Sequence, residues 1–167
     1  MNKKRDKRGQ MEMSFGMIFS IILIVIFIAF AVYAILKFIE TQRTTQVASF
    51  LNDFQIDIDK MWQSSGGSQE SNYNIPSNIE YVCLIDYESR ANNQENIYNE
   101  LKQNYNGKKN IFFYPLNSGK GFEKEIKNID IKKTTDSKNP FCIKSTKGKI
   151  KLTIKKDFGE ALVTISI

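Results

Sequence analysis

MSFGMIFSIILIVIFIAFAVYAIL, residues 13–36, is a run of 24 residues without a charged side chain. As an α-helix this run covers about 36 Å, which is enough to cross a hydrocarbon core of about 30 Å. A buried helix of a soluble protein normally carries a polar stripe, and this run has none. A secretory signal peptide has a shorter apolar region of about 7–15 residues, followed by a small-residue cleavage site that this run lacks. The run therefore predicts a membrane-inserted helix.

Basic residues gather on one side of this apolar run. Residues 1–9 carry a net charge of +4, whereas only Lys37 and Arg43 lie close behind the run. Because basic flanks stay in the cytoplasm, the sequence predicts a cytoplasmic leader over 1–9 and a transmembrane helix over 10–37. The rest of the chain is then extracellular, and the protein is a single-pass protein of the cell membrane.

The remaining charge is also unevenly distributed. The chain has a net charge of +6, which lies in the leader and in residues 120–167, whereas residues 41–119 are net acidic. Two separate basic clusters, one near each end, do not favour a specific nucleic-acid partner.

The helical pattern continues beyond Lys37. Apolar residues recur there at steps of three or four, namely Val47, Leu51, Phe54, Ile58 and Met61 or Trp62. This spacing predicts an amphipathic continuation of the helix over 38–64, which the sequence SSGGS at 64–68 ends. Its apolar face needs a partner, and we expect the following residues to supply one.

Residues 65–167 predict an extracellular α+β domain. The long helix is expected to pack on a small, mostly antiparallel sheet with one additional short helix. Strands are predicted at 79–87, 110–116 and 139–144, a short helix at 92–105, and a loop over the polar segment 66–78. Residues 149–155 and 163–167 alternate polar and apolar side chains around a turn, which predicts a hairpin with one buried face. Residues 122–131 are ambiguous, although Ile129 and Ile131 alternate like a strand.

The sequence contains two cysteines, Cys83 and Cys142, and no histidine. Each cysteine lies in a predicted strand, and an extracellular location permits a disulfide between them. The alternative is a pair of buried thiols. The absence of histidine removes the usual general base and the commonest transition-metal ligand, and no G-x-S-x-G or EF-hand pattern is present. The sequence therefore predicts a protein that is not an enzyme and has no cofactor or metal site.

The sequence Lys7-Arg8-Gly9-Gln10 stands directly before the long uncharged helix. This arrangement resembles the class III signal peptide of archaeal type IV prepilins, which a membrane-embedded prepilin peptidase cleaves after the glycine. The resemblance implies cleavage between Gly9 and Gln10. It also implies that the apolar helix then packs against other pilin-like subunits in the core of a filament.

The match to the family departs at one position. Members usually carry a glutamate at the fifth mature residue, which here is Ser14, and the nearest acid is Glu12. Either Glu12 takes that role two residues earlier, or no filament register depends on it. Gly16 and Ser20 form a small-xxx-small pair, which lets helices approach closely in lipid but also occurs often by chance. Glu12, Ser14, Gly16 and Ser20 are therefore the candidate assembly residues, including for a homo-oligomer through the apolar helix.

Lysines alternate along the predicted C-terminal hairpin at Lys149, Lys151 and Lys155, with Lys144, Lys147 and Lys156 nearby. This row is a candidate face for an anionic partner such as a surface polysaccharide, lipid head groups or extracellular DNA. No aromatic residues stand between these lysines, as stacking on single-stranded nucleic acid requires. The simpler alternative is a solvated strand face or an edge strand guarded by lysine.

Two functions remain open at this point. The first is a subunit or minor component of a type IV pilus-like filament. The second is an uncleaved, signal-anchored extracellular domain that binds an unknown ligand. The two differ at the Gly9–Gln10 bond.

Overall fold

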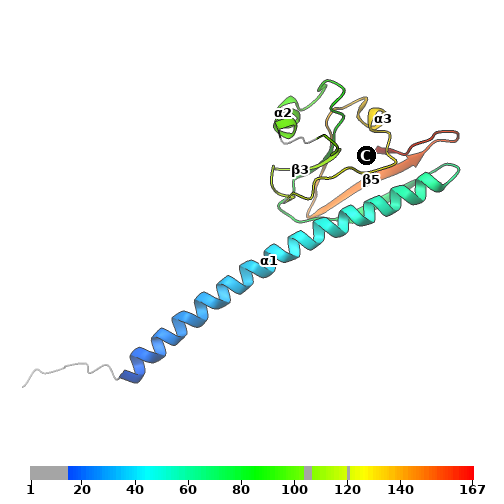
Figure 1. Ribbon diagram of the computed structural model, residues 1–167. Coiled ribbons are helices and arrows are strands. Elements are labelled where there is room, and N and C mark those ends of the chain that lie inside the picture. Colours follow the sequence, from blue (N-terminus) through cyan, green and yellow to red (C-terminus); the bar gives the residue numbers. More distant parts are fainter. Residues whose placement is uncertain (1–14, 104–106, 120) are drawn as a thin grey trace, which may run out of the picture. The chain divides into compact units, whose positions relative to one another are not determined.

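The structure is a computed structural model that describes residues 15–103, 107–119 and 121–167. The chain divides into two compact units that meet between Glu40 and Thr41. The fold is α+β, as the sequence predicts. Figure 1 shows its elements, which are α1 (Phe15–Gln63), β1 (Gly67–Asn74), β2 (Tyr81–Leu84), α2 (Glu95–Gln103), β3 (Ile111–Tyr114), α3 (Ile131–Thr135), β4 (Phe141–Lys144), β5 (Lys149–Lys156) and β6 (Thr164–Ser166).

The first unit contains the apolar part of α1. Every large apolar side chain between Phe15 and Ile39 is exposed, with exposed fractions from 38% to 84%. By length and composition, α1 is able to cross a membrane. The predicted apolar helix is therefore present, and it buries none of its side chains within the chain.

The second part of α1 belongs to the second unit and packs into its core. Its buried side chains are Val47, Phe50, Leu51, Phe54 and Ile58. The predicted apolar face is confirmed, with Phe50 added to it, whereas Trp62 is 41% exposed. The helix ends at Gln63, where the Ser64 hydroxyl donates a 2.6 Å hydrogen bond to the Met61 carbonyl.

Within the described residues, six strands form two antiparallel sheets of three strands each, in the orders β1-β5-β6 and β3-β2-β4. A tight turn joins β4 to β5, closed by the bridge between Thr146 and Lys149. Lys147 and Gly148 occupy its central positions with φ of 52° and 72°. This left-handed pair fits the two-residue turns that match the twist of a hairpin.

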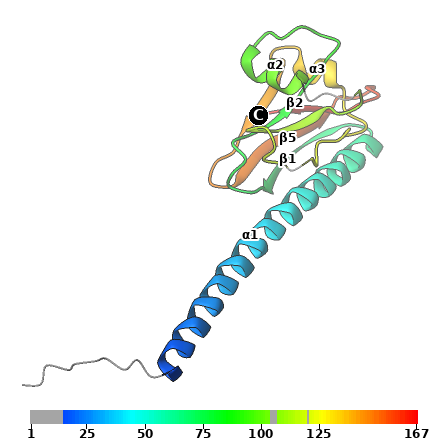
Figure 2. The same ribbon diagram turned by 60° about the vertical axis from the view of Figure 1, so that its left-hand side comes forward.

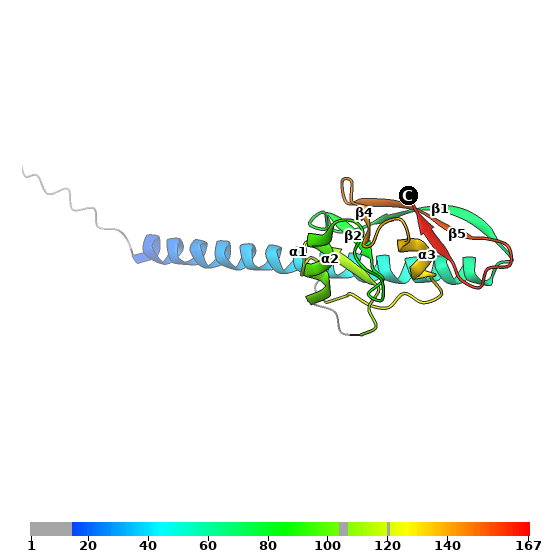
Figure 3. The same cartoon turned by 90° about the horizontal axis from the view of Figure 1, so that it is seen from above.

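The main core lies where the buried face of α1 meets the β1-β5-β6 sheet and one face of the β3-β2-β4 sheet. A second cluster, of Cys83, Ile85, Tyr98, Leu101 and Phe112, lies between the other face of the β3-β2-β4 sheet and α2. That sheet is therefore buried on both faces, which explains why β2 and β3 have continuous apolar sequences. Figures 1 and 2 show α2 and α3 on the side of this domain away from the second part of α1, and in Figure 3, seen from above, they lie in front of it.

The prediction of a loop over 66–78 was wrong, because residues 67–74 form β1. Ser71 and Tyr73 point into the core, and the strand pairs along its whole length with β5, from Gly67 opposite Lys156 to Asn74 opposite Lys149. Its many Ser, Asn and Gln side chains lie mostly on the solvent side. Tertiary pairing therefore overrides a composition that is typical of loops.

The ambiguous region after residue 122 contains a short bridge and a short helix. Ile129 pairs with Val163 in an isolated parallel bridge, and α3 begins immediately afterwards. The Asp130 side chain caps this helix by accepting a 3.0 Å hydrogen bond from the Lys133 backbone. The predicted C-terminal hairpin is confirmed as β5 and β6, although Ile167 is 75% exposed and does not continue the buried alternation.

Candidate functional site

Four of the predicted site residues lie outside the described residues. They are Gly9 and Gln10 of the processing site, and Glu12 and Ser14 of the assembly set. The same holds for the predicted leader over 1–9 and for the first residues of the predicted transmembrane helix. The processing site accordingly stays a prediction.

Gly16 and Ser20 lie on consecutive turns of α1. The Ser20 hydroxyl donates a 2.8 Å hydrogen bond to the Gly16 carbonyl. A serine satisfied by its own helix can enter an apolar environment without leaving a donor unpaired. The pair therefore presents a small, internally satisfied surface on an otherwise bulky apolar helix.

The two cysteines form a disulfide, as the sequence predicts. Cys83 and Cys142 stand directly opposite each other on β2 and β4, with an S–S distance of 2.06 Å and a Cα–Cα distance of 4.0 Å. Cys83 is fully buried, and Cys142 is half-buried. The bridge ties the central strand of one sheet to β4, the strand that precedes the tight β4–β5 turn.

The predicted lysine row lies on the exposed face of β5. Because β5 is the central strand of its sheet, the alternative of a lysine-guarded edge strand was wrong. Lys151 pairs with Glu70 at 2.8 Å, and Lys155 pairs with Asp157 at 2.8 Å. Lys149, by contrast, makes no ion pair with any residue that the structure describes.

Two neighbouring lysines take different roles. Lys156 is not part of the exposed lysine row. Its ammonium group donates hydrogen bonds to the carbonyls of Trp62 and Ser64 at the end of α1. Lys144, at the end of β4, lies close in the fold to Lys149 at the start of β5. Together they line a cavity of about 340 Å³, which we call the hairpin pocket, formed by Asn72, Cys142, Ile143, Lys144, Thr146, Lys149, Ile150, Lys151 and Ile167. The sequence indicated Lys149 and Lys151, but it gave no sign that Asn72 and Thr146 lie beside them.

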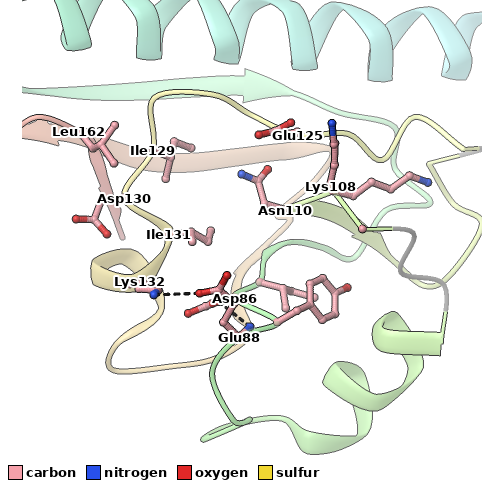
Figure 4. A pocket seen from close by; sticks show the side chains of 14 residues that line it. Asp86, Glu88, Lys108, Asn110, Glu125, Ile129, Asp130, Ile131, Lys132 and Leu162 are labelled. Carbon is pink, nitrogen blue, oxygen red and sulfur yellow. Dashed lines mark hydrogen bonds and ion pairs between the residues drawn. The ribbon is translucent and has the colours of Figure 1, made fainter.

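A second cavity, of about 520 Å³, opens between the end of β2 and the start of β3, and we call it the β2–β3 pocket. Figure 4 shows that side chains of both charges line it, among them Asp86, Glu88, Lys108, Glu125 and Lys132. The Lys132 ammonium group pairs with Glu88 at 3.0 Å.

The buried carboxylate of the β2–β3 pocket is already satisfied by the protein. Asp86 accepts a 2.9 Å hydrogen bond from the Glu88 backbone and a 2.6 Å hydrogen bond from the Ser89 hydroxyl. Its own backbone is held by the side chain of buried Asn139. A carboxylate that accepts these two hydrogen bonds fixes the turn that follows β2.

The pKa shifts have structural causes. Burial and a 2.8 Å hydrogen bond to Asp57 raise the pKa of Tyr73 well above its usual value. Burial, and then the charge of Asp86, raise the pKa of Tyr98. Among the described residues, no group of three or more His, Cys, Asp or Glu side chains is placed to hold a metal ion.

The chain matches no family of known proteins, no curated protein and no solved structure.

Proposed function

We propose that this protein is a subunit or minor component of a type IV pilus-like filament, with no catalytic activity of its own. Before assembly it is held in the cell membrane by the apolar part of α1, with the leader in the cytoplasm and residues 41–167 outside. The observation that carries the proposal is the division of α1 into an apolar part without a partner in the chain and a part fixed in the domain core.

The apolar part of α1 supports storage in lipid. Each of its large side chains would expose apolar area to water at a cost of about 25 cal/mol per Å². Lipid tails remove this cost, and so do the apolar side chains of neighbouring helices. Exchange of one environment for the other is nearly neutral in hydrophobic free energy, which makes transfer from membrane to filament feasible.

The core-packed part of α1 links this segment to the domain. Phe50 and Phe54 are each at most 2% exposed, and their rings lie 5.4 Å and 5.7 Å from the ring of Tyr73. A helix anchored this firmly carries the domain with it when its apolar part packs against other helices. Removal of the leader also removes a charge of +4, which anionic lipids attract by about 1 kcal/mol per basic residue.

The disulfide supports an extracellular domain. Disulfides persist in oxidising compartments and are rare in the cytoplasm. The Cys83–Cys142 bridge is therefore compatible with the orientation that the basic leader predicts.

Cleavage after Gly9 is the step that tests the proposal. The full chain is expressed with an archaeal prepilin peptidase, extracted from membranes and measured by intact mass spectrometry. We expect an N-terminus at Gln10. A Gly9→Val variant is expected to keep the leader, and a Lys3→Gln variant, which changes the leader charge outside the KRGQ motif, to be cleaved normally.

An uncleaved N-terminus in the presence of the active peptidase would contradict the filament proposal. It would favour the second candidate, a permanently anchored extracellular domain that binds a ligand. The observation that favours this candidate is that three lysines and no acidic side chain line the hairpin pocket. Shearing of intact cells separates the two further, because a filament subunit is released with the filaments and an anchored domain stays with the membrane.

A further inference from the structure

The hairpin pocket differs in its charge from the β2–β3 pocket and from a cavity beside α2. Its side chains include three lysines, Lys144, Lys149 and Lys151, and no acid. The β2–β3 pocket combines three lysines with four acids, and a cavity beside α2 combines Glu88 and Glu95 with Arg90 and Lys102. A concave surface whose charged side chains are all basic concentrates anions more strongly than one with side chains of both signs.

Two of the three lysines are available to a ligand. Lys151 forms an ion pair with Glu70, whereas Lys144 and Lys149 form no ion pair within the described part of the chain. Both are exposed and have the same cavity between them. An ammonium group without a partner gains most from an anion that accepts its hydrogen bonds, because charge-assisted hydrogen bonds are the stronger kind.

Neutral polar groups surround these lysines. Asn72 and Thr146 line the pocket itself. The pairing of β1, β5 and β6 places further polar side chains beyond it on the exposed face of the sheet, among them Ser68, Asn74, Thr153, Thr164 and Ser166. This face therefore combines amide and hydroxyl groups with the ion pairs of Lys151 and Lys155, next to a basic pocket. Such a surface suits a ligand that carries many hydroxyl groups as well as acidic ones.

We propose that the hairpin pocket binds the acidic groups of an anionic polysaccharide, with the sugar chain continuing over the polar face of the β1-β5-β6 sheet. The pocket has the size of small-molecule sites, which begin at about 300 Å³. Ile167, which is 75% exposed, gives it an apolar side chain against which the C–H face of a sugar ring can pack. The disulfide at Cys142 holds β4, and with it Lys144, in place.

Two other anionic partners fit this surface less well. Single-stranded nucleic acid is bound by stacking of bases on aromatic side chains, and the hairpin pocket has no aromatic residue. A lipid surface requires several apolar side chains that project beside the lysines. Of the isoleucines that line this pocket, two are buried and Ile167 alone is exposed. The proposal goes beyond the proposed function and does not depend on cleavage of the leader.

Binding is tested on the full chain in an uncharged detergent, with polygalacturonate and dextran sulfate as separate probes and neutral dextran as the reference. At about 0.05 M salt, where charges are weakly screened, we expect both acidic polymers to bind and neutral dextran not to bind. The two acidic probes show whether carboxylate or sulfate groups are preferred. Loss of both unpaired lysines, in Lys144→Gln/Lys149→Gln, is expected to weaken binding by about tenfold or more.

Two control variants make the test specific. Lys127→Gln/Lys138→Gln removes the same charge from exposed lysines outside the hairpin pocket and is expected to change the affinity by less than about twofold. Glu70→Gln frees Lys151 from its ion pair and is expected to strengthen binding.

Three outcomes would overturn the proposal. The first is equal loss in the two double-lysine variants, which indicates unspecific attraction to a basic protein. The second is unchanged binding in Lys144→Gln/Lys149→Gln. The third is tighter binding of duplex DNA or of vesicles containing anionic lipid, with the same dependence on Lys144 and Lys149, which assigns the pocket to that partner instead.

Discussion

The two parts of α1 share one helix and differ in everything that surrounds it. Between Phe15 and Ile39 all large apolar side chains are exposed, whereas between Thr41 and Gln63 five apolar side chains are fully enclosed by the domain. The same residue types therefore have two different uses. In the second part they stabilise the fold of this chain, and in the first part they can only be stabilised by something outside it.

This difference separates two kinds of stability in one molecule. The free energy of unfolding of the domain depends on the second part of α1, and the proposed association of the chain with lipid or with other helices depends on the first. A substitution in one part should leave the property governed by the other part unchanged.

The largest effect is expected from a cavity in the domain core. Phe54 is 1% exposed and packs against Phe50 and Tyr73. Phe54→Ala is expected to lower the free energy of unfolding of the domain by about 3–5 kcal/mol, measured by denaturant titration in detergent. Phe27→Ala, in the apolar part, is the matched control and should leave that free energy unchanged. An equal loss in both variants would show that the apolar part of α1 also stabilises the domain.

A charge in the apolar part should have the opposite pattern. Ile26→Asp places a carboxylate near the middle of the apolar segment and is expected to raise the free energy of membrane insertion by about 2.5–3.5 kcal/mol. The measurement is the fraction of chain that resists alkaline extraction from membranes, with Ile26→Leu as control. The domain should unfold at the same denaturant concentration in all three proteins. Unchanged membrane retention in Ile26→Asp would show that this segment is not in lipid.

The disulfide provides a third test, confined to the domain. The disulfide joins residues at a sequence separation of 59. Its removal in Cys83→Ala/Cys142→Ala is expected to lower the free energy of unfolding by about 2–4 kcal/mol. A reductant should destabilise the native protein similarly and leave the variant unaffected. Membrane retention should change with neither treatment, and a change there would show that the two parts of α1 are not independent.

The smallest effect concerns the Tyr73 hydroxyl, which donates to Asp57 of α1 at 2.8 Å. Tyr73→Phe is expected to cost about 1 kcal/mol at neutral pH. Because folding raises the pKa of Tyr73 from its usual 10.0, the stability that it contributes is complete below about pH 10 and is lost as the pH rises further. Denaturant titrations between about pH 8 and pH 11 should therefore show a shallower decline in Tyr73→Phe. Tyr33→Phe, in the apolar part, should follow the native protein, and an equally steep decline in Tyr73→Phe would exclude this origin.

The sequence predicted best where a pattern is long and local. The apolar run, the helical face from Val47 to Ile58 and the hairpin of β5 and β6 each repeat a spacing over several turns or several strand residues, so that a few exceptions do not hide it. Phe50 joins the buried face because it lies four residues before Phe54 and one before Leu51, which widens the predicted stripe.

The features that were missed depend on partners distant in the sequence. β1 is a strand because β5 lies beside it, although its Ser, Gln and Asn side chains resemble those of a loop. The short helix α3 depends on a cap from Asp130 and lacks the length for a periodic signal.

The candidate sites follow the same rule. The sequence indicated the lysines of β5, but the pairing of Lys151 with Glu70 and the approach of Lys144 and Asn72 arise from strand register. The cysteine pairing was predicted from strand location, and its cross-strand register was not visible in the sequence.

The pairing of β1 with β5 has a consequence for the order of events during translation. The indole of Trp62 donates a hydrogen bond to the Ala161 carbonyl, and in the described part of the chain β1 pairs with β5 alone. The first residues of the domain therefore complete these contacts only after the last residues have been synthesised. The apolar part of α1 therefore leaves the ribosome long before the β1-β5-β6 sheet can form. In the proposed orientation, that segment has reached the bilayer while the domain is still unfolded, and folding is completed after the chain has crossed.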